Sequence, residues 1–143
     1  MIVHKGQIIH TLRINDYKEI KTLWDAEAGI IQRDWETKER YAILIRRNFE
    51  TSVSIRDNNQ IIAAALAGTD GWRGYLYHLV VRNTHRRQGY AELLIDYISE
   101  RFKSQKVSRV HVLTAIENEV GRSFFSHLGF QQRTDVTLFS RDT

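Results

Sequence analysis

The sequence contains no cysteine among its 143 residues. That absence excludes a disulfide framework, a thiolate nucleophile and any metal site built on cysteine. No group of His, Asp and Glu residues has the spacing of a metal-ligand set, so we expect no bound metal. The absence of disulfides also fits a cytoplasmic protein, which is the localisation we expect.

Long apolar runs and linker-like stretches are missing as well. The longest purely apolar run covers residues 61–67, whereas a membrane-spanning helix needs about 20 residues. The N-terminal stretch has no apolar core of the kind that a signal peptide requires. Proline is absent, and no stretch is rich in glycine or serine. We therefore expect one domain over residues 1–143, with no membrane partner.

Positive charge is in moderate excess, with a formal net charge of +4 and a sequence pI of about 9.5. Such a balance favours an anionic partner. Four basic side chains, Arg82, His85, Arg86 and Arg87, stand directly before a glycine and a helical pattern. That placement suits a small phosphate ligand better than a nucleic-acid groove, and no helix-turn-helix pattern accompanies it. Nucleic-acid binding is thus the weaker alternative, and we expect no nucleic-acid partner.

The first half of the chain reads as helices followed by an antiparallel meander. Residues 8–14 form a β-compatible stretch, and Asp16 with Glu19 has capping-box spacing before a helical repeat. An irregular stretch at 28–36 precedes a second helical pattern at 37–48. The remaining strand patterns cover residues 51–56, 61–66 and 75–81, separated by turn residues.

The second half changes to strand–helix alternation. Its patterns predict a helix from 91 to 102, a strand at 109–115, a helix at 118–128 closed by Gly129, and a strand at 134–141. A helix between two strands of one sheet is a crossover, so the strands that flank it are expected to run parallel. The predicted fold class is α/β (α+β), with a mixed, mostly antiparallel sheet, one parallel pair and flanking helices.

The junction between the strand at 75–81 and the next helix has the chemistry of an anion site. The first amides of a helix have no internal partner and carry the positive end of the helix dipole. Gly89, at the start of this helix, lets the backbone approach a ligand closely, and Arg86 and Arg87 add positive charge. A diphosphate would suit such a site. The spacing is neither Gly-x-Gly-x-x-Gly nor a P-loop.

Two short motifs in this half resemble those of the GNAT superfamily of acyl-CoA-dependent N-acyltransferases. Arg86-x-x-Gly89-x-Ala91 is similar to the family's Gln/Arg-x-x-Gly-x-Gly/Ala signature, and Asn118, Phe124-Phe125 and Gly129-Phe130 resemble its second signature. The resemblance covers about residues 75–130. The Asp-Gly-Trp-Arg-Gly turn at 70–74 is similar, more weakly, to a bacterial branch related to ribosomal-protein acetyltransferases.

The resemblance implies a transferase that moves an acetyl group from acetyl-CoA to a primary amine of a small molecule or a protein. It implies that backbone groups of Leu79, Val80 and Val81 pair with the pantetheine arm and that the Asn118 side chain touches it again. It places the pyrophosphate near the segment Arg86, Arg87, Gln88, Gly89, Tyr90 and Ala91. Dimers are common in the family, so a homodimer stays open.

The acid and the base are not identified by the resemblance. Phe125 stands where relatives usually carry a tyrosine acid, and phenylalanine has no proton to give. Tyr75 and Tyr77 stand where some relatives carry a Glu or His base, although tyrosine is a poor base unless its pKa is lowered. His78 is one residue out of phase with them, so we expect it on the other face of the sheet as a packed or hydrogen-bonded histidine.

Acceptor binding is implied at Asp34, Trp35 and Glu36, which lie in the stretch that relatives use for this purpose. An exposed loop before a helix is an equally good interpretation of these three residues. Phe125 and the missing carboxylates also leave a second function open, that of an acyl-CoA-binding module with little or no catalytic activity. Without cysteine, direct attack of the amine in a ternary complex is the simpler scheme for an enzyme.

Overall fold

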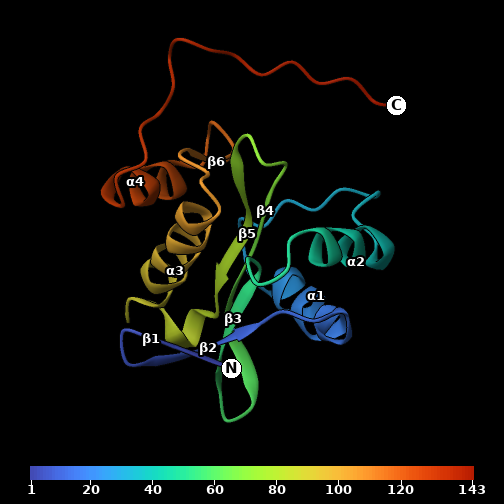
Figure 1. The fold of residues 1–143 in the computed structure, drawn as a ribbon, viewed down its shortest axis with the longest axis vertical. Coiled ribbons are helices and arrows are strands. Elements are labelled where there is room, and N and C mark those ends of the chain that lie inside the picture. Colours follow the sequence, from blue (N-terminus) through green and yellow to red (C-terminus); the bar gives the residue numbers. More distant parts are fainter. The chain divides into compact units, whose positions relative to one another are not determined.

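The computed structural model describes residues 1–143 and contains six strands, four α-helices and two short 3-10 helices. In chain order they are β1 (Ile2–His4), β2 (Gln7–Thr11), η1 (Ile14–Asp16), α1 (Tyr17–Ala26), α2 (Lys38–Arg47), β3 (Val53–Asp57), β4 (Gln60–Thr69), β5 (Gly74–Val81), η2 (Asn83–His85), α3 (Tyr90–Ser104), β6 (Val110–Val112) and α4 (Glu119–His127). The chain divides into two compact units, Met1–Leu113 and Thr114–Thr143, which are described separately. Figure 1 traces these elements along the chain.

The six strands of the first unit form one sheet in the order β1-β2-β3-β4-β5-β6. Neighbours from β1 to β5 are antiparallel, and β5 with β6 is parallel. The predicted meander and the predicted parallel pair across a helical crossover are both confirmed. The crossover helix, α3, covers one face of the sheet, while α1 and α2 cover the other (Figure 1).

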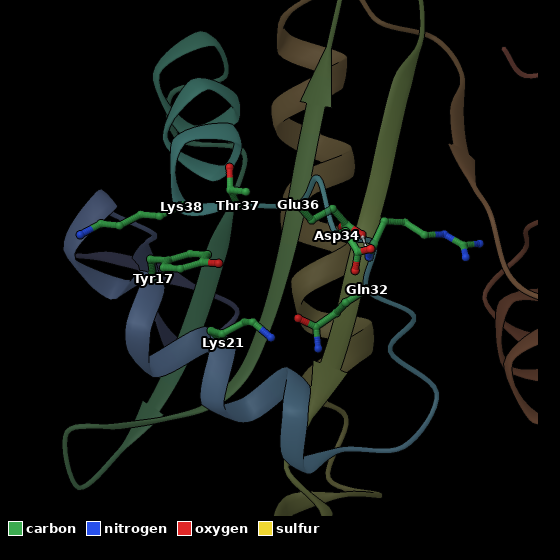
Figure 2. A pocket seen from close by; sticks show the side chains of 8 residues that line it. Tyr17, Lys21, Gln32, Asp34, Glu36, Thr37 and Lys38 are labelled. Carbon is green, nitrogen blue, oxygen red and sulfur yellow. Dashed lines mark hydrogen bonds between the residues drawn. The ribbon is translucent and has the colours of Figure 1, made fainter. Parts of the chain in front are cut away.

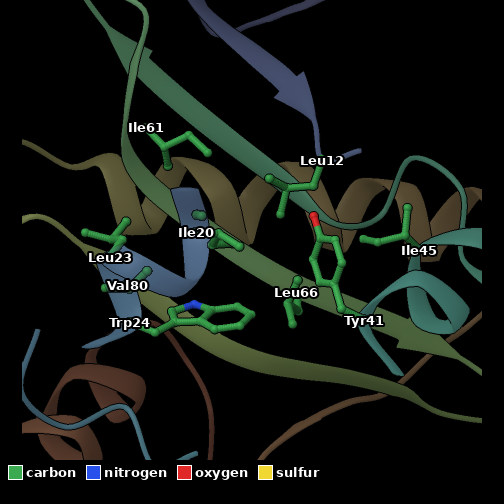
Figure 3. Packing of buried hydrophobic residues seen from close by; sticks show 10 residues of the cluster. Leu12, Ile20, Leu23, Trp24, Tyr41, Ile45, Ile61, Leu66 and Val80 are labelled. Carbon is green, nitrogen blue, oxygen red and sulfur yellow. The ribbon is translucent and has the colours of Figure 1, made fainter. Parts of the chain in front are cut away.

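The face of the sheet under α1 and α2 carries a closely packed apolar core. Side chains from both helices pack against side chains of the central strands (Figure 3). The buried cluster consists of Leu12, Ile20, Leu23, Trp24, Tyr41, Ile45, Ile61, Ala64, Leu66 and Val80. The helical repeat at Ile20, Leu23 and Trp24 therefore faces the core as predicted. Burial of this many apolar side chains is the main stabilising contribution on this face.

Contact between α3 and β5 depends on a glycine. A Cβ placed on Gly74 would come within 2.7 Å of the Phe102 ring, which is fully buried. Glycine at the first residue of β5 thus lets α3 lie directly against the strand. This contact fixes how the end of β5 and the start of α3 are placed with respect to each other.

The sheet begins with a hairpin that we did not predict. β1 pairs with β2 through a two-residue turn, Lys5 and Gly6, in which both residues have positive φ angles of 47° and 82°. Two residues with positive φ fit the tight turn of a two-residue β-hairpin. The apolar run at 8–14 was expected to be the first strand, and only its first half belongs to β2.

The second unit contains α4 and an extended C-terminal stretch. α4 begins at the residue after Asn118, close to the predicted bounds. The predicted strand at 134–141 is wrong, because these residues form no ladder with any strand and are exposed, with Phe139 at 90%. An alternating apolar pattern favours a strand only where a neighbouring strand supplies hydrogen bonds and a surface to cover.

None of the helices combines the length and the apolar character that crossing a membrane requires.

Candidate functional site

The edge of β5 on the β6 side is only partly paired. β6 matches Gly74, Tyr75 and Leu76 and then ends at Val112, while β5 continues to Val81. Within the unit Met1–Leu113, no strand pairs with residues 77–81 on this side. The structure therefore leaves an open strand edge at Leu79, Val80 and Val81, the residues to which the sequence assigns the pantetheine arm. An open edge of this kind can accept an extended ligand as an added strand.

A β-bulge interrupts β5 in the same stretch. Tyr77 pairs with Leu66 and Val80 pairs with Ala64, so His78 and Leu79 together stand opposite one residue of β4. His78 has a φ angle of 47°, in the left-handed region that non-glycine residues rarely adopt. A bulge adds one residue to one strand and changes which face the following side chains occupy.

The bulge corrects our prediction for His78. We expected its side chain on the opposite face from Tyr77, because side chains alternate along a regular strand. Instead the His78 ring packs edge-on against Trp24 of α1, at 4.9 Å between ring centroids, on the α1–α2 face to which Leu66 and its partner Tyr77 also belong. The expectation that His78 is packed and hydrogen-bonded is confirmed.

Downstream of β5, the chain turns through η2 into α3 with two left-handed residues. Arg87 has a φ angle of 59° and Gly89 one of 81°. Gly89 is the N-cap of α3, and no side chain caps this helix. A Cβ on Gly89 would meet nothing within 4 Å, so the chain is uncrowded on that side of the N-cap. The helix start therefore presents free N–H groups and the positive end of its dipole.

Most of the basic cluster before α3 is already paired. The His85 ring lies 2.9 Å from Asp57, and the Arg82 guanidinium donates to the Ile61 carbonyl oxygen. Arg86 donates to Glu27 at 2.8 Å and to the Val81 carbonyl oxygen at 3.3 Å. Only Arg87 makes no hydrogen bond or ion pair. The cluster thus mainly holds the loop in place, and the helix amides with Arg87 are what remains for an anion.

Glu27 is a structural residue that sequence reasoning missed. Its side chain is only 7% exposed, and it accepts hydrogen bonds from the Asn83 N–H and the Arg86 guanidinium. It therefore ties the end of α1 to the loop before α3. In the sequence it is one more glutamate near the end of a helical pattern, and no local signal distinguishes it from a solvent-exposed residue.

The segment between α1 and α2 forms a polar hollow of about 390 Å³. Figure 2 shows side chains from α1, the connecting segment and the start of α2 around it, namely Tyr17, Lys21, Gln32, Arg33, Asp34, Glu36, Thr37 and Lys38. Of the predicted acceptor residues, Asp34 and Glu36 line this hollow, whereas Trp35 is exposed outside it. The charged residues around it are three basic ones, Lys21, Arg33 and Lys38, and two acidic ones, Asp34 and Glu36.

Glu36 joins this hollow to β5. Its Oε1 lies 2.5 Å from Nε2 of His78, and its Oε2 accepts from the Arg33 N–H at 2.5 Å. The Glu36 N–H in turn donates to the Arg33 carbonyl oxygen. This reciprocal pair of bonds makes residues 33–36 a closed turn that holds the carboxylate against the bulge.

Tyr75 and Tyr77, named as base positions, stack on each other with ring centroids 6.2 Å apart. Burial is the first cause that raises the pKa of Tyr77, followed by the negative charge that Tyr75 and Asp70 can carry. A higher pKa keeps the hydroxyl protonated, so Tyr77 is unsuited to accept a proton near neutral pH.

In the second unit, Asn118 and Phe125 both have structural contacts. The Asn118 side-chain oxygen accepts from the Gly121 N–H at 2.9 Å and so caps α4, while its amide donates to Thr114. The Phe125 ring packs edge-on against Phe124 and Phe130. No hydroxyl stands at the usual acid position.

A family model described as "Acetyltransferase (GNAT) family" matches residues 14–130. Among solved structures with a similar fold are the ribosomal-protein-alanine N-acetyltransferase of Brucella melitensis biovar Abortus 2308 (17% identity, 95% of this chain and 98% of that one, TM-score 0.70) and the aminoglycoside 6'-N-acetyltransferase of Acinetobacter haemolyticus (18%, 96% and 99%, TM-score 0.69). A predicted acetyltransferase of Clostridium acetobutylicum, solved with acetyl-CoA, is similar at 15% identity over 93% and 95% of the two chains, with a TM-score of 0.73.

At these identities the solved structures show a shared fold and nothing finer. The family model covers most of the chain, including β5, the loop with η2, and α3. The chain therefore belongs to the GNAT family of acyl-CoA-dependent N-acetyltransferases.

Proposed function

We propose that this protein transfers an acetyl group from acetyl-CoA to a primary amine, by direct attack of the amine in a ternary complex. The observation that carries the proposal is the open edge of β5 leading into the uncapped start of α3. The open edge of β5 can accept an extended arm, and the uncapped start of α3 can accept an anion. A pantetheine arm that ends in a pyrophosphate has this combination of chemical groups.

The residues fit such a donor. Leu79, Val80 and Val81 would pair with the pantetheine amides through their backbone, and the amides from Arg87 to Ala91 would hold the pyrophosphate. The missing Cβ at Gly89 leaves the space that the pyrophosphate needs. The side chain of Arg87 makes no hydrogen bond or ion pair within the protein and is free to meet an anion.

Acetyl transfer from a thioester to an amine does not require a covalent intermediate on the enzyme. Acetyl-CoA, when bound, supplies an acetyl group activated as a thioester. The chain has no cysteine, so no acyl-enzyme forms on sulfur, and direct attack of the amine on the thioester is the simpler scheme. A backbone N–H near Val81, at the open edge of β5, would donate to the oxyanion.

The acceptor would enter from the hollow between α1 and α2. This hollow meets β5 through Glu36, so an amine held there lies beside the strand to which the donor binds. The similar structures include a ribosomal-protein-alanine N-acetyltransferase and an aminoglycoside 6'-N-acetyltransferase. Both names describe acetylation of a nitrogen atom, which supports an amine as the acceptor, and an amine screen would identify which one.

Titration calorimetry of the full-length protein with acetyl-CoA tests the donor. We expect saturable binding in competition with CoA, and a loss of at least 100-fold in affinity in Gly89→Val, because a side chain would fill the space in front of the amides. Valine at a φ of 81° is also strained, so a matched control is needed.

Gly71→Val provides that control. Gly71 has a φ of 89° and an open surrounding, like Gly89, but lies in the turn between β4 and β5. It should pay the same backbone strain and keep acetyl-CoA affinity, with circular dichroism and thermal unfolding confirming that both variants fold. Unchanged affinity in folded Gly89→Val would refute the pyrophosphate assignment, and no binding to the wild-type protein would refute the proposed function.

A further inference from the structure

We propose that Nδ1 of His78 accepts the proton of the acceptor amine and that Glu36 orients the imidazole for this role. The inference rests on the proposed function, since it names the base of the same site. His78 would be a catalytic residue, because it touches the reacting amine, and Glu36 a positioning residue, because it acts through His78.

The backbone at His78 is the first support. A φ of 47° costs energy for a side chain with a Cβ, and a bulge in the middle of a long strand interrupts its hydrogen-bonded ladder. Such conformations persist where the surrounding structure enforces them, and bulges often redirect a side chain next to an active site. Here the bulge moves the imidazole from the α3 face of the sheet to the face that carries the hollow.

The bond to Glu36 determines which nitrogen is free. A carboxylate only accepts hydrogen bonds, so Nε2 of His78 must carry the proton that it shares with Glu36. In the neutral imidazole the lone pair is then on Nδ1. Nδ1 makes no hydrogen bond, and it is not one of the fully buried polar atoms that lack a partner, so it is accessible. It is the only ring nitrogen of His78 that can accept a proton.

Packing keeps the ring in place. The edge-on contact with Trp24, itself almost fully buried in the core (Figure 3), supports the ring from the side of α1. The closed turn at residues 33–36 supports it through the carboxylate. An oriented imidazole with a carboxylate behind it is the arrangement that makes histidine an efficient proton acceptor.

The position of His78 is the fourth support. His78 lies in the unpaired stretch of β5, directly before Leu79, the first residue assigned to the pantetheine arm, and consecutive Cα atoms are about 3.8 Å apart. Its partner Glu36 lines the hollow proposed for the acceptor (Figure 2). The imidazole thus lies where the two substrates have to meet.

The other candidates fit less well. The raised pKa of Tyr77 keeps its hydroxyl protonated, and both oxygens of Glu36 already accept hydrogen bonds. Asp34 lines the hollow but makes no hydrogen bond or ion pair with β5.

The proton balance of the step is simple. An ammonium gives one proton to Nδ1 of His78 and becomes the free amine. Its nitrogen forms the new bond to the acetyl carbon, and the carbon–sulfur bond breaks with the electron pair staying on sulfur as the thiolate. The second proton of the nitrogen passes to the thiolate or to solvent, and the imidazolium returns its proton to solvent.

The tautomer of His78 can be tested without knowing which amine accepts the acetyl group. In full-length protein with 15N-labelled histidine, long-range 1H–15N correlation near neutral pH should show His78 with its proton on Nε2 and a lone pair on Nδ1. The resonances are assigned by their loss in His78→Asn, and Glu36→Gln should weaken the preference. A proton on Nδ1, or a doubly protonated ring, would overturn the inference.

Kinetics test the role. Asparagine tolerates positive φ, so His78→Asn should keep the bulge while removing the proton acceptor. Against the best acceptor from a panel of peptides with free N-termini and small di- and polyamines, we expect kcat to fall roughly 100-fold or more, with the affinity for acetyl-CoA unchanged. The deficit should shrink for an acceptor amine of low basicity, which needs no base near neutral pH.

His10→Asn is the matched control. His10 lies on β2, separated from β5 by β3 and β4, and the same substitution there should leave kcat unchanged. Full turnover in folded His78→Asn would refute the inference while leaving the proposed function intact. Failure of the wild-type protein to bind acetyl-CoA would instead refute the proposed function, whatever the tautomer of His78.

Discussion

The two sides of β5 offer different parts of the polypeptide to a ligand. On the proposed donor side, the open groups are backbone amides and carbonyls, and the charged side chains of the loop mostly bind residues of other elements. On the proposed acceptor side, the open groups are side chains that line a hollow, with only the turn at residues 33–36 fixed by backbone bonds.

Because of this difference, we expect substitutions to affect donor binding and acceptor binding in different ways. A donor site built from backbone depends on loop shape, so changes that move the loop should have large effects and changes of exposed side chains small ones. An acceptor site built from side chains should respond to each of them separately. Three substitutions test this contrast.

Glu27→Ala should have the largest effect. It leaves the Arg86 guanidinium and the Asn83 N–H without their partner at a site where the carboxylate is buried. Because Arg86 is 52% exposed, we expect a loss of about 2 kcal/mol in the free energy of unfolding, below the range for a fully buried pair. Acetyl-CoA affinity should fall too, as the loop loses its anchor.

Urea unfolding and calorimetry measure both effects of Glu27→Ala. Asp25→Ala, two residues earlier at the end of α1, removes exposed bonds from Lys21 and Gln32 and should leave the free energy of unfolding nearly unchanged. Equal stability of the two variants would show that the buried carboxylate does not hold the loop.

Asp34→Asn should have an intermediate effect confined to the acceptor side. Loss of one carboxylate from the hollow should raise KM for the amine about 5- to 10-fold, because an ammonium loses one favourable charge contact worth about 1 kcal/mol. Steady-state kinetics at saturating acetyl-CoA measure it. The affinity for acetyl-CoA should stay the same, and a parallel loss of both would mean that the two sides are not separate.

Arg87→Ala should have the smallest effect. Arg87 is exposed and its guanidinium makes no hydrogen bond or ion pair, so it adds only screened charge to a site held by amides. We expect acetyl-CoA affinity to fall about threefold at low salt and less at high salt. Calorimetry at two salt concentrations decides this, and a loss as large as in Gly89→Val would show that the side chain is the main phosphate contact.

The elements around the donor site could be predicted because their signals are local. An apolar run, a basic loop, a glycine and a helical repeat follow one another from Tyr75 to Phe102, and the structure has the strand, turn and helix in that order. The parallel pairing of β5 with β6 followed from the crossover rule. The glycine at the helix start needed no knowledge of the rest of the chain.

Other features depend on distant residues and could not be predicted. Every residue from Tyr75 to Val81 except His78 is apolar or aromatic, so no alternation marks the bulge that sends His78 to the other face. The bonds of Glu27 and Glu36 join residues more than 40 positions apart. The alternating segment at 134–141 has the local pattern of a strand, but no partner strand.

The short length of β6 has a further consequence. If an extended donor arm occupies the edge that β6 leaves open, the ligand supplies the backbone partners that the polypeptide itself does not. Folding and donor binding are then thermodynamically linked, with the native state stabilised by RT ln(1 + [L]/Kd). The protein would be most resistant to unfolding and proteolysis when the acetyl donor is abundant, so its lifetime would follow the metabolic supply of its own substrate.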